Sequence, residues 1–237
     1  LLAHRFLPGH LGPLAAALAA AGDAVVFLHA EGEAALPGVR TVRIRPHREP
    51  APATHPYLQP LERAVLLGQA AFRAALDLGR EGFRPDLIHA HLGFGTALYL
   101  KDVWPDAPLL GLAEWYYRAR GADADHLDPA ALGPDDLLRI RTLNAGLLLE
   151  LAACDSVIVP TRFQQDAFPA PWRDRLEVAP DGVEVALSVA AADDASWAGT
   201  FTITAGARAP ATRTVAGASC VEVVEALTLI LALTYDP

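Results

Sequence analysis

Several residue types are scarce or absent in this chain of 237 residues. Methionine is absent, Lys101 is the only lysine, and there are two cysteines, Cys154 and Cys220. Two cysteines outside a C-x-x-C pair cannot form a disulfide framework, and they favour a reducing, cytoplasmic setting. Because the chain opens without methionine and without a secretory signal, we expect it to be a fragment of a cytoplasmic protein.

Positive charge and long apolar runs are also scarce. The formal net charge is −9, so the chain lacks the basic face that a nucleic-acid-binding protein needs, and no nucleic-acid partner is expected. The apolar run at 221–233 is interrupted by Glu222 and Glu225 and is too short for a transmembrane segment. Neither a G-x-G-x-x-G nor a Walker motif occurs, so no dinucleotide or P-loop cofactor is predicted.

What the chain does contain is a regular alternation of apolar strands and helices over residues 1–185. Alternation of this kind predicts an α/β fold with a doubly wound parallel (Rossmann-like) sheet of about six or seven strands. We expect the short strand at 1–4 to lie centrally in the sheet, beside the strand at 86–91, and the strand at 39–44 to lie at an edge. The expected strands are 1–4, 24–29, 39–44, 86–91, 108–113, 156–160 and 176–179, and the expected helices are 11–21, 61–78, 95–103, 135–153 and 162–168.

The pattern changes after residue 185. Residues 186–237 are rich in Ala, Thr, Ser and Val and form a short atypical C-terminal tail. A strand is possible at 200–204. The segment 220–233 fits either a strand or a helix, because its periodicity does not separate the two. We therefore expect two parts, 1–185 and 186–237.

Polar residues gather where the predicted strands end. In an open parallel sheet, ligands bind beyond the carboxyl ends of the strands, so residues at these ends are the site candidates. Glu114 and His91 are the predicted catalytic residues, because a carboxylate or an imidazole there can accept a hydrogen bond or a proton. The predicted substrate-binding residues are His4, Gly9, His10, Gly93, Tyr117, Arg118 and Arg162.

Other interpretations of these residues stay open. Glu114 could instead be a structural partner of Arg118, and the Pro8–Gly9 pair could be a simple turn before a helix. His89 and His91 point the same way on a strand, but no third ligand follows at a recognisable spacing, so no metal is expected. Glu150 is expected on the solvated face of its helix.

Four segments, in this order, resemble landmarks of a known family: "HRFLPGHLGPLAAALAAAGDAVVFL", "RPDLIHAHLGFGTALYLKDVWPDAPLLGLAEWYYR", "ACDSVIVPTRFQQDAFP" and "DRLEVAPDGVE". The set resembles the amino-terminal, acceptor-side domain of GT-B fold, family 4 retaining glycosyltransferases. The resemblance implies one half of a GT-B fold, with Gly9 near the transferring phosphate and His91 lining the cleft. It also implies a nucleotide-sugar donor and a sugar, glycan or lipid-linked acceptor.

Two features depart from the family pattern. Glu114 stands where many members have a histidine that contacts the donor sugar. Residues 186–237 lack both the basic pair and the E-x7-E segment of the donor-binding domain, with Arg208 and Arg213 as their only cations apart from histidine. This chain alone is therefore expected to be inactive, and its tail to be a truncated or substituted remnant. The alternatives are a sugar-nucleotide epimerase of GT-B fold and a non-catalytic sugar- or nucleotide-binding module.

Overall fold

The computed structural model describes residues 1–121, 132–180, 184–193, 196–204 and 211–235. The chain divides into two compact units, Leu1–Ala179 and Pro180–Pro237. The division lies a few residues before the expected one at 185, because residue 185 already belongs to a strand of the second unit. In the described residues no helix is both long enough and apolar enough to cross a membrane.

The first unit is the predicted parallel sheet. Its seven strands run in the order β3-β2-β1-β4-β5-β6-β7, and every pairing within it is parallel. As expected, the short first strand lies centrally beside β4, and β3 is at an edge. The strands are β1 Leu2–Ala3, β2 Val25–His29, β3 Val39–Arg43, β4 Ile88–His91, β5 Leu109–Leu112, β6 Ser156–Val159 and β7 Leu176–Val178.

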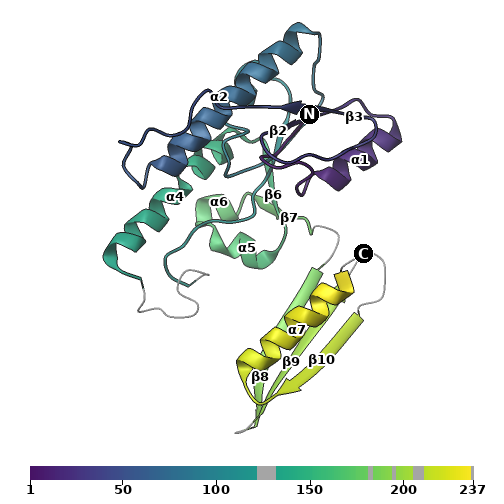
Figure 1. Ribbon diagram of the computed structural model, residues 1–237, viewed down its shortest axis with the longest axis vertical. Helices are drawn as coiled ribbons and strands as arrows, with labels where there is room; N and C mark the ends of the chain where they lie inside the picture. Colours follow the sequence, from purple (N-terminus) through teal and green to yellow (C-terminus); the bar gives the residue numbers. More distant parts are fainter. Residues whose placement is uncertain (122–131, 181–183, 194–195, 205–210, 236–237) are drawn as a thin grey trace. The chain divides into compact units, whose positions relative to one another are not determined.

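Helices cover both faces of this sheet, as a doubly wound fold requires. One core cluster joins α2 and α4 to the sheet through residues such as Leu67, Ala71 and Leu147, and the two helices lie together in Figure 1. A second cluster packs α1 against Leu2 and Phe27. The helices are α1 Gly12–Ala21, α2 Gln59–Arg80, α3 Leu100–Val103, α4 Pro134–Ala153, α5 Arg162–Ala167 and α6 Ala170–Arg173.

One predicted helix is much shorter than expected. Residues 95–103 were expected to be helical, but only Leu100–Val103 forms α3, and turns precede it. Gly95 has a φ of 93°, outside the right-handed helical region, and an added Cβ there would collide with the backbone of Ala64. The segment is held in turns because it passes close to α2.

The second unit is a three-stranded antiparallel sheet with one helix along it (Figure 1). It consists of β8 Glu184–Asp193, β9 Ser196–Thr204, β10 Ala211–Gly217 and α7 Cys220–Tyr235. The ambiguous segment at 220–233 is thus helical. Ser219 accepts a hydrogen bond from the Glu222 amide at 3.2 Å, and the Glu222 carboxylate accepts one from the Ala218 amide at 2.8 Å. This is a variant of a capping box, and it starts the helix.

Candidate functional site

Four of the predicted site residues meet at the carboxyl edge of the sheet. His4 follows β1, His91 ends β4, and Glu114 follows β5, and these three strands are neighbours in the sheet. His10 reaches the same place from the turn that leads into α1. We refer to His4, His10, His91 and Glu114 as the histidine–glutamate cluster. Its members come together because parallel strands end at the same edge.

The Glu114 carboxylate lies between two imidazoles. Its Oε2 is 2.9 Å from Nε2 of His91, and its Oε1 is 3.2 Å from Nδ1 of His10. The His91 side chain is 4% exposed, that of Glu114 31% and that of His10 53%, so the cluster runs from the core to the surface. Glu114 has its ion-pair contacts with these histidines, and Arg118 contacts the carbonyl of Asp166 instead.

The electrostatics of the cluster favour an ionised Glu114 and a neutral His4. The close approach of the His91 imidazole to its carboxylate holds the pKa of Glu114 below its usual range, against the opposing effect of burial. Burial, followed by the proximity of His91 and His10, lowers the pKa of His4 to about 4. At neutral pH the cluster therefore presents a carboxylate and an uncharged His4 imidazole.

Backbone contacts fix the orientation of His4. Its Nδ1 accepts a hydrogen bond from the Phe6 amide at 2.8 Å, so the ring proton lies on Nε2. Gly9 lies directly against the ring: its φ is 51°, and an added Cβ would be 2.7 Å from two ring atoms of His4. Gly9 is thus required at this turn both for its backbone conformation and for its lack of a side chain.

Gly93 is placed beside the cluster by a residue that sequence analysis assigned wrongly. Glu150 on α4 was expected on a solvated face, but it is fully buried. It accepts hydrogen bonds from the Gly93 amide at 2.6 Å and the Ala97 amide at 2.9 Å, and so holds the loop that follows His91. Burial raises the pKa of Glu150 to about 7, although these bonds oppose the shift. The available signal was the pair Leu147 and Cys154, which lie three residues before and four residues after Glu150 and are both buried.

Tyr117 and Arg118 lie at a different cavity, of about 360 Å³, with Arg120, Leu137 and Arg141. Asn144 fixes this segment through two 2.8 Å hydrogen bonds, one with the Tyr117 amide and one with its carbonyl. Arg162 is exposed in the first turn of α5, whose N-cap is Thr161. Within the described residues, none of these three predicted substrate-binding side chains contacts the histidine–glutamate cluster.

The cluster also has the donor atoms for a cation. His4, His10 and His91 each place one ring nitrogen so that the three atoms lie within 4.8 Å of one another. Sequence analysis considered His91 with His89, but the Nδ1 atom of His89 is 3.0 Å from the Leu110 carbonyl oxygen. The Nε2 atom of His4 is buried without a hydrogen-bond partner among the described residues. Because Nε2 of His4 carries the ring proton, a ligand that accepts a hydrogen bond would satisfy it directly, whereas a cation would have to displace that proton.

A second polar region borders the cluster. Five arginines (Arg5, Arg43, Arg45, Arg48 and Arg63) line a cavity of about 320 Å³, together with Glu31 and Glu49. We call it the arginine cavity. Phe94 lines the cavity as well and stacks on His91, with ring centroids 5.1 Å apart and an angle of 22° between the rings. None of these arginines was among the residues predicted for the site, because only Arg5 lies close to a strand end that carries one, His4.

The solved structures to which this chain is similar include the following two. One is the UDP-GlcNAc 2-epimerase from Neisseria meningitidis bound to UDP-GlcNAc, with 13% identity and a TM-score of 0.35, over 75% of this chain and 44% of that chain. The other is a UDP-glucose:anthocyanidin 3-O-glucosyltransferase in complex with UDP, with 15% identity and a TM-score of 0.42, over 76% of this chain and 52% of that chain. This chain thus spans about half the length of each.

No curated protein matches the sequence. A family model does: that of the glycosyl transferase family 4 group matches residues 21–187. This range includes the second to seventh strands of the parallel sheet, together with His91, Gly93 and Glu114. Because the match covers well over half of the sequence, the chain belongs to the glycosyl transferase family 4 group.

Proposed function

We propose that this chain is the acceptor-side half of a glycosyltransferase that moves a sugar from a nucleotide-sugar to an acceptor hydroxyl with retention of configuration. The observation that carries the proposal is the Glu114 carboxylate held between His10 and His91 at the carboxyl edge of the sheet. Family membership supports the transfer chemistry, and this cluster supplies groups that such chemistry uses.

In the proposed reaction the acceptor oxygen forms a bond to the anomeric carbon on the same face of the sugar from which the diphosphate departs, so that the configuration is retained. The electron pair of the broken bond leaves on the diphosphate, and the acceptor hydroxyl loses its proton. Glu114, ionised at neutral pH, accepts a hydrogen bond from that hydroxyl, or it orients His91 to receive the proton. A carboxylate hydrogen-bonded to an imidazole increases the basicity of the ring, as in other catalytic pairs.

The departing diphosphate needs positive charge. In the proposal, amide groups of the turn at Gly9 and of the start of α1 face it, because a helix N-terminus attracts anions. Further cations come from a donor-side half, since residues 186–237 contain only Arg208 and Arg213 and no lysine. We therefore expect no sugar transfer by the 237-residue chain alone and only weak binding of nucleotide-sugars.

The test compares this chain with the complete protein encoded by the reading frame that contains it. Release of nucleoside diphosphate from a panel of nucleotide-sugars is measured with both, and the anomeric configuration of any product is determined by NMR. Transfer by the complete protein, its loss in Glu114→Gln and its retention in the exposed control Glu177→Gln would support the proposal. Micromolar binding of a nucleotide-sugar by the chain alone would show that the donor site is misplaced.

The same experiment separates the epimerase alternative. The carboxylate and the histidines of the cluster can also act as acid and base on a sugar carbon. An epimerase converts the nucleotide-sugar into its epimer without an acceptor and without releasing nucleoside diphosphate. A new nucleotide-sugar in the NMR spectrum of an acceptor-free reaction would therefore replace the transferase proposal. If the complete protein binds the ligand but catalyses neither reaction, the alternative of a non-catalytic binding module would be favoured instead.

A further inference from the structure

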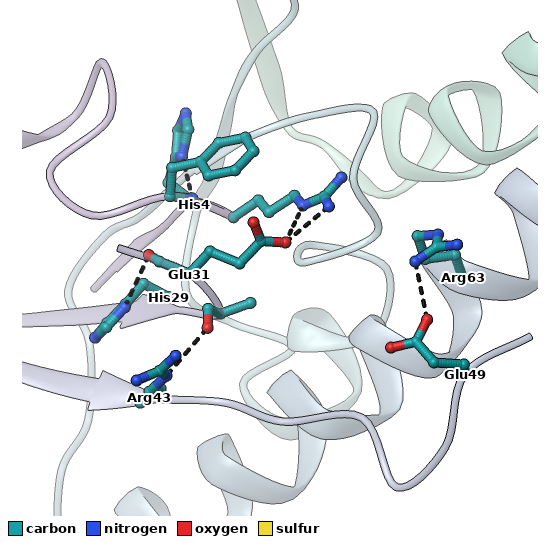
Figure 2. Close-up of polar contacts among 9 residues, drawn as sticks. His4, His29, Glu31, Arg43, Glu49 and Arg63 are labelled. Carbon is teal, nitrogen blue, oxygen red and sulfur yellow. Dashed lines mark hydrogen bonds and ion pairs between the residues drawn. The ribbon is translucent and has the colours of Figure 1, made fainter. Parts of the chain in front are cut away.

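The arginine cavity combines segments that are far apart in the sequence. Arg5 comes from the loop after β1, Arg43 from the end of β3, Arg45 and Arg48 from the following proline-rich loop, and Arg63 from α2. Figure 2 shows two sides of the region, with Arg43 on the strand side and the Arg63–Glu49 pair on the helix side. Positive charge is thus concentrated in one place on a chain whose formal net charge is −9.

The carboxylates around the cavity do not neutralise it. Four of the five arginines form ion pairs: Arg5 with Glu31 at 2.7 Å, Arg43 with Glu33 at 3.6 Å, Arg48 with Glu62 at 2.6 Å and Arg63 with Glu49 at 2.9 Å. In the described part of the chain, Arg45 has no carboxylate within ion-pair distance. Five arginines thus stand against four carboxylates, and the unpaired Arg45 leaves the cavity with an excess of one positive charge.

Two of these pairs, Arg5–Glu31 and Arg63–Glu49, can be exchanged for a ligand at little cost. The Arg63 and Glu49 side chains are 51% and 78% exposed, and those of Arg5 and Glu31 are 30% and 51% exposed. Exposed ion pairs of this kind stabilise a fold only weakly. An anion with several acceptor oxygens can therefore displace the glutamates, since guanidinium groups bind phosphate in a bidentate manner.

The cavity also has an apolar wall that lies next to the histidine–glutamate cluster. Leu66, Leu67 and Phe94 contribute to its lining, and the Arg5 guanidinium lies 5.7 Å from the centroid of the Phe94 ring. Phe94 also stacks on His91. A ligand whose charged end contacts the arginines would thus place its other end against the Phe94 ring, which stacks on His91.

We propose that the arginine cavity binds a phosphate group carried by the acceptor, so that the acceptor is a phosphorylated sugar or polyol. The five guanidinium groups hold the phosphate, and Phe94 and the leucines contact the carbon skeleton. The acceptor hydroxyl is thereby directed towards Glu114. The identification of the ligand as the acceptor rests on the proposed function, whereas the anion site itself does not.

Isothermal titration calorimetry on the 237-residue chain tests the site without any turnover. The probes are inorganic phosphate, glycerol 3-phosphate and glucose 6-phosphate, with glycerol and glucose as uncharged controls and glucuronate as a carboxylate. We expect saturable binding of the phosphates, tightest for the phosphorylated sugar or polyol, and no binding of the uncharged probes. The double variant Arg45→Gln/Arg63→Gln should weaken binding by tenfold or more.

The control is Arg73→Gln, an exposed arginine of the same helix α2 that does not line the cavity. It removes one charge, as does each substitution of the double variant, and should leave the affinity within about twofold, the effect expected of a distant screened charge. Circular dichroism confirms that each variant is folded. No saturable phosphate binding, or equal affinity in the double variant, would overturn the site. Preferential binding of glucuronate would replace the phosphate with a carboxylate.

UDP is titrated as a further probe in the same experiment. If UDP binds and loses its affinity in the double variant, the cavity holds the diphosphate of a donor, and the assignment to the acceptor is overturned. Failure of this inference and failure of the proposed function give different results. Phosphate binding with no transferase activity in the complete protein removes only the proposed function, whereas transferase activity with no phosphate binding removes only the inference.

Discussion

The histidine–glutamate cluster and the arginine cavity are adjacent, but they carry charge in opposite ways. In the cluster, His4 and His91 are buried, and each ionisable group is held by one or two specific contacts. In the cavity the charges are exposed and numerous, and their partners can be exchanged. Burial makes the charged form of a group costly and its protonation dependent on its neighbours. The guanidinium groups of the cavity stay charged at any ordinary pH because the pKa of arginine is very high, and their exposed ion pairs are weakened by salt. The first arrangement suits proton transfer and the second suits reversible binding of an anion.

The largest expected effect is on the pH dependence of stability, and it comes from the buried Glu150. Because the pKa of Glu150 is raised to about 7, the folded state keeps a proton that the unfolded state releases between about pH 4.5 and pH 7. This contribution to stability is present below that window and is lost as the pH rises through it, by up to about 3 kcal/mol. Glu150→Gln should abolish the loss.

His4 changes the stability with pH in the opposite direction to Glu150. Its lowered pKa of about 4 means that the unfolded state gains a proton below about pH 6.5 while the folded state does not. Its contribution is lost as the pH falls, and His29 and His89, also lowered by burial, act in the same direction. Urea denaturation from pH 4.5 to 7.5 should therefore show Glu150→Gln losing more stability in acid than the wild type. Parallel profiles would contradict this, and Glu177→Gln is the exposed control.

A smaller effect is expected at the turn beside His4. Gly9→Ala should lower the free energy of unfolding by roughly 2–3 kcal/mol, because it combines a left-handed backbone with a collision against the His4 ring. Gly22→Ala is the matched control: the φ of Gly22 is 99°, but no atom lies near an added Cβ. Thermal or urea denaturation of both variants separates the two costs. Equal losses would show that the His4 ring moves away freely.

Glu114→Gln tests whether the cluster acts on a ligand or only on its own fold. If the carboxylate contacts the acceptor, the substitution in the complete protein should weaken acceptor binding by roughly 1–3 kcal/mol, the usual range for a charged hydrogen-bond partner. If it only stabilises His10 and His91, the melting temperature should fall while the Michaelis constant of the acceptor stays the same. A stable variant with unchanged kinetics would remove Glu114 from the site.

The smallest effect is expected on the exposed side of the comparison. Arg63→Gln breaks the contact with Glu49, yet the free energy of unfolding should change by no more than about 0.5 kcal/mol. Urea denaturation at low and high salt should show this small difference vanishing at high salt. A loss above 1 kcal/mol would mean that Arg63 has a structural role, and the two regions would then differ less than proposed.

Much of the architecture could be predicted from the sequence. Apolar strands alternating with helices indicated the parallel sheet, the central place of the first strand and the edge position of β3. The shortened α3 was missed because its turns depend on contact with the backbone of Ala64, which is distant in sequence. The ambiguity at 220–233 arose from a nearly continuous apolar run, although Ser219 and Glu222 carried a local helix-start signal.

The sequence by itself determined which polar side chains follow the strands. Once these strands form a parallel sheet, His4, His91 and Glu114 lie at its carboxyl edge. Only the tertiary structure decided that His10 would reach Glu114, that Glu150 would be buried under the loop after His91, and that Arg5, Arg45 and Arg63 would share one cavity. The physical reason is the range of the interactions. Strand ends are set by local periodicity, whereas these contacts depend on how separate helices and loops pack across the sheet.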